Sequence, residues 1–125
     1  MKIYKNATEL VGKTPLINLR RLRQKLKLKA DILAKCEFFN PSFSVKDRAA
    51  KAMIEAAEQN GVTKDTVFVE ATSGNMGIAL SSICAAKGYK IVILMPENMP
   101  SERITVMRRF GAEVILTPAA DGMSG

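Results

Sequence analysis

From residue 31 onward, short apolar runs alternate with segments whose apolar residues recur every three or four positions. The runs predict strands at "DILAKCEF" (31–38), "TVFVEA" (66–71), "KIVILMP" (90–96) and "AEVILTP" (112–118). The helical spacing between them predicts helices over 44–60, 75–87 and about 100–110. Strands that alternate with helices form parallel sheets. We therefore expect an α/β fold with a small parallel four-stranded sheet and helices on both faces.

The first thirty residues fit this alternation poorly. "GKTPLINL" reads as one extended segment, and "LRRLRQKLKLK" (19–29) has leucines at helical spacing among basic residues. The second stretch predicts an amphipathic surface helix. We divide the chain into an N-terminal segment, residues 1–30, and a small α/β domain, residues 31–125.

Composition excludes several classes of function. The chain has 125 residues with 47% hydrophobic and 25% charged residues, as soluble globular domains do. The net charge of +7 suggests nucleic acid, but no aromatic residue interleaves the basic run, so we expect no nucleic-acid partner. The longest uncharged stretch, 71–86, is too polar to span a membrane. We expect a cytoplasmic protein that binds no membrane.

The chain has no histidine and two cysteines. Cys36 and Cys84 both lie in apolar runs, which favours buried thiols in a reducing compartment over a disulfide. Without histidine and with isolated cysteines, we predict no metal site. Any chemistry must then use lysine, hydroxyl and amide groups, or a bound cofactor.

Two turns, 39–46 and 71–77, join predicted strands to predicted helices, where ligands of parallel sheets bind. In the first, "NPSFSVKDR", Ser44 and Asp47 have capping-box spacing, which places Ser44 at the N-cap and Lys46 in the first helical turn. The helix dipole disfavours a positive charge there and so favours the neutral amine that Schiff-base chemistry uses. The alternative is an ordinary solvated lysine.

The second turn, "ATSGNMG", is rich in hydrogen-bond donors. Thr72, Ser73 and Asn75 add side-chain donors to the free amides of a helix N-terminus, which favour an anion. Gly74 and Gly77 allow close approach of the backbone to a ligand. The anion could be a carboxylate, a phosphate or a phenolate. A capped helix with glycine turns is the alternative, and it explains only part of the pattern.

These residues resemble those of the cysteine synthases, or O-acetylserine sulfhydrylases, in the tryptophan-synthase-β-like group of pyridoxal-phosphate enzymes. The resemblance rests on "KTPLINL", "NPSFSVKDR", "ATSGNMGIAL", "GYKIVILMPENMPSERITVMRRFGAEVILT" and "DGMSG", in that order. It extends over almost the whole chain. It implies a pyridoxal-phosphate cofactor and cysteine biosynthesis by β-replacement, in which O-acetylserine and sulfide give cysteine and acetate.

The resemblance also implies roles for single residues. Lys46 would bind the cofactor as a Schiff base and later shuttle the proton of the substrate Cα. Asn75 would hydrogen-bond the 3′-oxygen of the cofactor. Thr72, Ser73 and Asn75, with the backbone of the turn at Gly74, would bind the α-carboxylate of an amino-acid substrate. Met76 departs from the family, which usually has threonine there.

Members of the family are about twice as long or longer, as two domains. We therefore expect this chain to be an N-terminal portion in which residues 1–30 belong to the larger domain, and to be inactive alone. The complete enzyme would be a homodimer and could bind serine acetyltransferase. The alternatives are a fragment of an enzyme like cystathionine β-synthase or O-phosphoserine sulfhydrylase, or a non-catalytic fragment that binds a serine acetyltransferase tail.

Overall fold

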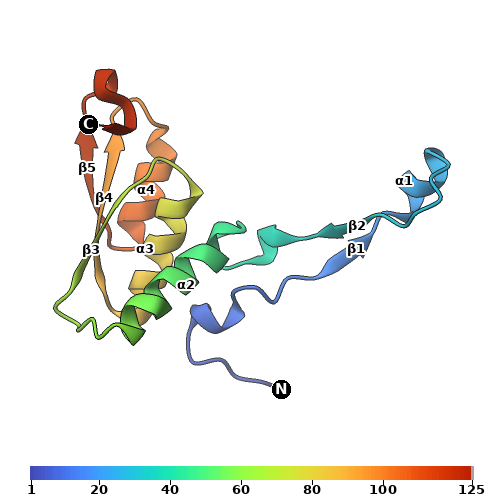
Figure 1. The fold of residues 1–125 in the computed structure, drawn as a ribbon, viewed down its shortest axis with the longest axis horizontal. Coiled ribbons are helices and arrows are strands. Elements are labelled where there is room, and N and C mark those ends of the chain that lie inside the picture. Colours follow the sequence, from blue (N-terminus) through green and yellow to red (C-terminus); the bar gives the residue numbers. More distant parts are fainter. Residues whose placement is uncertain (125) are drawn as a thin grey trace.

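The computed structural model describes residues 1–124, and its centre is a parallel sheet of three strands. The strands are β3 (Val67–Ala71), β4 (Lys90–Pro96) and β5 (Glu113–Thr117), in the spatial order β3-β4-β5 (Figure 1). The central strand is apolar except at its first residue, and Ile93 and Met95 are wholly buried. The strands predicted at residues 66–71, 90–96 and 112–118 are thereby confirmed.

Three helices cover one face of this sheet. They are α2 (Lys46–Gln59), α3 (Asn75–Lys87) and α4 (Ser101–Arg109), and α3 contacts both of the others. The core lies between them and β4; its largest members include Ile54, Leu80, Ile83, Ile91 and Met107. The bounds of α3 agree with the sequence prediction. Gly88 ends this helix in the left-handed conformation, with φ 75°, where glycine is favoured.

The other face of the sheet is uncovered among residues 1–124. Val67, Val69 and Ile115 point to it and are exposed, with Val69 61% accessible. Because consecutive right-handed crossovers in the order β3-β4-β5 place both connecting helices on one side, α3 and α4 share a face. The prediction of helices on both faces is therefore wrong for the described residues.

The predicted fourth strand belongs to a different sheet. β2 (Leu33–Lys35) pairs antiparallel with β1 (Leu16–Asn18), with Leu16 opposite Lys35. Together with α1 (Arg20–Lys25) these strands form an arm that extends from the body (Figure 1). The α/β class is thus confirmed, but the parallel sheet has three strands, not four. An apolar run specifies a strand without specifying its partner.

The remaining elements are short. The 3-10 segments among residues 1–124 are η1 (Ala7–Leu10), η2 (Glu37–Phe39) and η3 (Ala119–Ser124), the last interrupted by a non-helical residue at Gly122. The basic helix is shorter than predicted, because Lys27 adopts a positive φ of 51° just beyond it. Both cysteines are buried free thiols, as predicted, and burial raises the pKa of Cys84 to about 11. Within residues 1–124 no helix has the length and apolar character needed to cross a membrane.

Candidate active site

The helices α2 and α3 pack against each other and run in the same sense relative to the sheet (Figure 1). Each leads into a strand of the parallel sheet, β3 after α2 and β4 after α3. Both helices therefore run back from the carboxyl ends of the strands, which is the usual binding edge of such sheets. The predicted turns lie at the start of these two helices.

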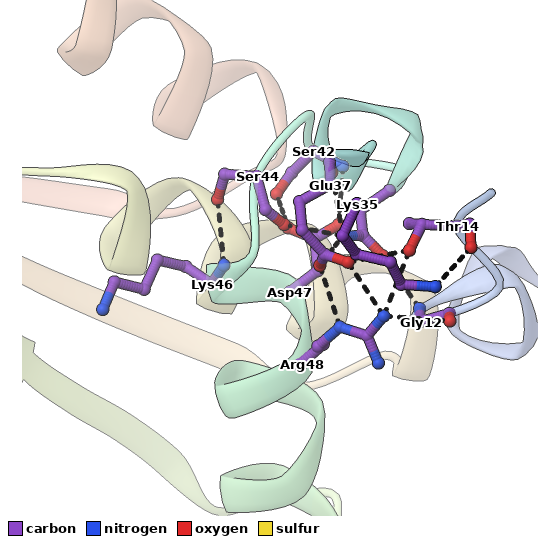
Figure 2. Close-up of polar contacts among 10 residues, drawn as sticks. Gly12, Thr14, Lys35, Glu37, Ser42, Ser44, Lys46, Asp47 and Arg48 are labelled. Carbon is purple, nitrogen blue, oxygen red and sulfur yellow. Dashed lines mark hydrogen bonds and ion pairs between the residues drawn. The ribbon is translucent and has the colours of Figure 1, made fainter. Parts of the chain in front are cut away.

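Lys46 is the first residue of α2, and its side chain is exposed. The predicted N-cap, Ser44, is wrong by one residue, because the N-cap position is Val45. The Ser44 hydroxyl still accepts a hydrogen bond from the Lys46 amide at 3.1 Å and so satisfies the first amide of α2. Figure 2 shows the Lys46 side chain extending away from the polar cluster around Arg48. Its amine is thus presented on a separate side of the helix start.

Asp47 does not complete the capping box. Its carboxylate accepts hydrogen bonds from the Ser42 amide, at 2.7 Å, and from the Ser42 hydroxyl. Asp47 is only 1% exposed, so this carboxylate is an internal brace for the loop before α2. The spacing of Ser44 and Asp47 predicted the helix start to within one residue but gave the wrong partner for Asp47. A buried carboxylate must be hydrogen-bonded, and the donors that surround Asp47 are those of Ser42.

The loop before α2 is held by a second buried side chain, Asn40, which is 1% exposed. Its amide group donates to the Glu37 and Ser44 carbonyls at 2.9 and 3.0 Å, and its oxygen accepts from the Gly12 amide at 2.8 Å. Phe43 follows in a left-handed conformation, φ 63°, which is unfavourable for a bulky residue. The contacts of Asn40 therefore keep the entry to α2 in one conformation.

Arg48 and Glu37 form a bidentate ion pair beside this loop (Figure 2). The Arg48 Nε and Nη2 atoms lie 2.8 and 2.9 Å from the two Glu37 carboxylate oxygens. Arg48 also donates to the Gly12 carbonyl and to Thr14 Oγ1, at 3.0 and 3.1 Å. Hydrogen bonds from Arg48, then Thr14 and Asn40, lower the pKa of Glu37 to about 2. The network ties α2 to the N-terminal segment.

The turn before α3 is different, because its amides are open. The Thr72 amide continues the sheet by donating to the Leu94 carbonyl at 3.0 Å. Within the described chain, no recorded hydrogen bond is donated by the next four backbone amides, those of Ser73, Gly74, Asn75 and Met76. A Cβ built on Gly74 would have no heavy atom within 4 Å. Four free donors and open space at a helix N-terminus suit an anion.

Gly77 has another role than the one predicted. A Cβ at this position would lie 2.7 Å from Met107 Cε and 2.8 Å from Thr72 Cγ2. The residue therefore allows α4 to approach the start of α3, and its close neighbours are protein atoms. Met76, the departure from the family, is half-buried against the core. Gly74 is the glycine of this turn that borders open space.

Sequence reasoning missed Arg103. Its Nη1 atom donates to the Ser73 carbonyl at 2.8 Å, from the first turns of α4. Arg103 and Met107 are four residues apart, so they share one face of the helix, and both reach the turn before α3. That spacing alone marks no contact in the sequence, because the contact depends on α4 lying beside this turn.

A family model described as "Pyridoxal-phosphate dependent enzyme" matches residues 7–124. The chain belongs to this family. The match covers nearly all of the chain, and the predicted pyridoxal-phosphate dependence is confirmed at the level of the family.

Individual relatives agree. The chain is 50% identical over its full length to a "Probable cysteine synthase" of Bacillus subtilis, of which it covers 40%. It aligns with the crystal structure of O-acetyl serine sulfhydrylase isoform 3 from Entamoeba histolytica with a TM-score of 0.92 and 40% identity, over 99% of this chain and 38% of that one. It also aligns with the crystal structure of an O-acetylserine dependent cystathionine β-synthase from Helicobacter pylori, with a TM-score of 0.87 and 35% identity. That alignment covers 100% of this chain and 41% of the other. The chain thus spans about 40% of the length of these relatives.

The residues present fit pyridoxal phosphate. An exposed primary amine at Lys46 is the group that reacts with an aldehyde. The open amides before α3 suit a phenolate oxygen or a carboxylate. Among residues 1–124, no group of three or more His, Cys, Asp or Glu side chains is placed to bind a metal.

Proposed function

We propose that the complete protein is a cysteine synthase, which uses pyridoxal phosphate to convert O-acetylserine and sulfide to cysteine and acetate. The observation that carries the proposal is the pairing of an exposed lysine at the start of α2 with four open amides at the start of the adjacent α3. The "Probable cysteine synthase" of Bacillus subtilis, which is 50% identical to this chain, supports the same activity.

Lys46 is assigned the covalent attachment of the cofactor and the transfer of the substrate Cα proton. When bound, pyridoxal phosphate withdraws electrons from the Cα of an amino acid and makes that proton acidic. The Lys46 amine projects from the first turn of α2, away from the Arg48–Glu37 pair. Because no acidic partner of Lys46 occurs among the ion pairs of residues 1–124, its amine is available for both tasks.

The turn before α3 is assigned the α-carboxylate of the substrate. The Thr72 and Ser73 hydroxyls and the Gly74 amide supply donors, and the positive end of the α3 dipole adds a favourable field. The Asn75 side chain, exposed at the first position of α3, is assigned a hydrogen bond to the 3′-oxygen of the cofactor. This arrangement would set the Cα of the substrate near the Lys46 amine.

A second candidate is the formation of cystathionine. The name of the Helicobacter pylori relative couples O-acetylserine with a cystathionine β-synthase, at 35% identity. The two candidates share the first half-reaction and differ in the sulfur nucleophile, sulfide or homocysteine. Offering both thiols to the complete, cofactor-loaded protein and measuring the amino-acid product distinguishes them. Cysteine as the main product favours our first candidate.

Further proposals concern the complete protein. The arm of β1, α1 and β2 exposes Leu16, Leu22 and Leu33. We assign residues 1–30, which include β1 and α1, to the larger domain. We also propose a homodimer, a cytoplasmic location and binding of a serine acetyltransferase tail. The described chain alone is proposed to be inactive. Size measurement of the complete protein tests the dimer, and a tail-peptide binding assay tests the partner.

Reductive trapping tests the cofactor assignment on this chain. The protein is incubated with pyridoxal phosphate, reduced with borohydride and analysed by peptide mass mapping. Dominant modification of Lys46, lost in Lys46→Ala and retained in the matched control Lys51→Ala, supports the proposal. Lys51 is a suitable control because it lies on the same helix and pairs with Glu55 at 3.8 Å. Modification spread evenly over the surface lysines contradicts it.

A further inference from the structure

One charged residue reaches the open turn from outside it. Arg103 lies near the start of α4, is half-buried, and donates from Nη1 to the Ser73 carbonyl oxygen at 2.8 Å. Four residues later, Met107 is wholly buried, and its Cε atom would lie 2.7 Å from a Cβ at Gly77. One face of α4 therefore holds the turn at two points, one polar and one apolar.

The hydrogen bond at Ser73 has a directional consequence. A trans peptide group is planar, with its carbonyl oxygen and its N–H on opposite sides. No peptide bond among the described residues is cis. Fixing the Ser73 oxygen toward α4 therefore points the N–H of the same peptide group, which belongs to Gly74, away from α4. That N–H makes no recorded hydrogen bond within residues 1–124, and the space at Gly74 is open.

The same bond also has an electronic consequence. A carbonyl that accepts a hydrogen bond from a charged donor is polarised, and the N–H of its peptide group becomes a stronger donor. The Arg103 guanidinium would thus increase the donor strength of the Gly74 amide without touching the ligand. Its charge would also favour an anion nearby.

We propose that Arg103 is a positioning residue for the carboxylate-binding turn: by holding the Ser73 carbonyl it orients the Gly74 N–H toward the ligand. The proposal rests on the assignment of the substrate carboxylate to this turn. It adds a residue of α4 to a site that is otherwise built from the starts of α2 and α3. It predicts that Arg103 acts on carboxylate affinity through the order of the turn.

The test combines two nuclear magnetic resonance measurements on the full chain with Arg103→Met. Backbone 15N relaxation reports the order of the turn without ligand, and titration with O-acetyl-L-serine reports carboxylate affinity. Arg103→Met is expected to lower the order parameters of Ser73, Gly74 and Asn75 from about 0.85 to below about 0.6. It is also expected to weaken binding by about tenfold or more, as misplaced binding groups do.

Two further variants keep the result interpretable. Arg109→Gln removes one positive charge from the same helix at an exposed position, so it controls for long-range attraction. Arg103→Lys retains a charge and one donor, and should recover part of the affinity and of the order. Unchanged order parameters in Arg103→Met, or equal weakening in Arg109→Gln, overturn the proposal.

Failure of the proposed function gives a different result. If the wild-type turn is ordered and loses order in Arg103→Met, yet O-acetyl-L-serine shifts no turn amide in the wild type, the turn is positioned but binds no carboxylate. That outcome overturns the ligand role of Arg103 together with the assigned function. Lost order with specifically lost affinity supports both.

Discussion

The starts of α2 and α3 are adjacent helix N-termini with opposite treatment of their backbone amides. At α2, the Lys46 amide donates to the Ser44 hydroxyl, and the preceding loop is braced by buried Asn40 and Asp47. At α3, four consecutive amides from Ser73 to Met76 have no recorded partner in the described chain. The first three amides of α2 thus have acceptors within the chain, the Ser44 hydroxyl and the Ser44 and Val45 carbonyls, whereas the first two amides of α3 and the two before them have none among residues 1–124.

The difference indicates a division of labour. A side chain that must be held in one place requires a rigid base, and the loop before α2 provides one for Lys46. A ligand site requires donors that the protein itself does not satisfy, and the turn before α3 provides these. Substitutions at one helix start should therefore change stability, and substitutions at the other should change ligand binding.

The largest effect is expected from Asp47→Ala at the start of α2. The substitution leaves the Ser42 amide without its acceptor and removes a buried acid that makes two hydrogen bonds. We expect a loss of about 2–3 kcal/mol in the free energy of unfolding, measured with urea. Glu55→Ala is the control: Glu55 is a partly exposed acid on the same helix, and its ion pair with Lys51 contributes at most about 0.5 kcal/mol. Equal losses would contradict the bracing role.

A glycine pair sharpens the comparison at the start of α3. Gly77→Ala places a methyl group 2.7 Å from Met107 Cε and 2.8 Å from Thr72 Cγ2, so we expect a loss of about 1–2 kcal/mol. Gly74→Ala meets no atom within 4 Å and should leave stability nearly unchanged. It should instead weaken the binding of O-acetyl-L-serine. Urea unfolding and ligand titration of both variants check this, and a stability loss in Gly74→Ala would argue against open space there.

Removal of the cap on α2 should have a smaller effect. Ser44→Ala deletes the acceptor of the Lys46 amide and is expected to cost about 1 kcal/mol. Thr105→Ala is the matched control, because its hydroxyl donates to the Ser101 carbonyl at an exposed position and caps no amide. Urea unfolding of the two variants measures the difference. A cost no larger than that of the control would show that Ser44 does not stabilise the start of α2.

The smallest effect concerns pH, because the Arg48–Glu37 pair is accessible to solvent. The pKa of Glu37 falls from an ordinary value of 4.5 to about 2 in the folded protein. Its contribution to stability is therefore present above about pH 4.5 and is lost as the pH falls toward 2. Urea midpoints between pH 7 and pH 2.5 should fall less steeply in Glu37→Gln than in the wild type. Parallel curves would contradict this contribution.

Local signals in the sequence predicted local structure well. The spacing of apolar residues predicted α3 with its observed bounds and α4 to within about one residue at each end. The pairing of β2 with β1 was not predictable, because the apolar pattern of "DILAKCEF" predicts a strand but does not specify which strand it pairs with. The missing cover on one sheet face was not predictable for the same reason: it depends on which strands are neighbours.

The candidate site shows the same limit. The residue types at strand-to-helix turns, together with a family resemblance, predicted the site residues Lys46, Thr72, Ser73, Gly74 and Asn75. The bond from Arg103 to Ser73 joins residues thirty positions apart, and no local pattern marks it. The roles of Asp47 and Gly77 were also misassigned, because burial and the approach of α4 decide them.

The contrast between the two helix starts can be measured directly by titrating the 15N-labelled chain with O-acetyl-L-serine and following its backbone amides. We predict saturable shifts at Ser73, Gly74, Asn75 and Met76, with little change at the amides of Lys46 and Arg48. A neutral analogue without the carboxylate should not reproduce them. Shifts of equal size at both helix starts, or none at the turn before α3, would contradict the division of labour proposed for this site.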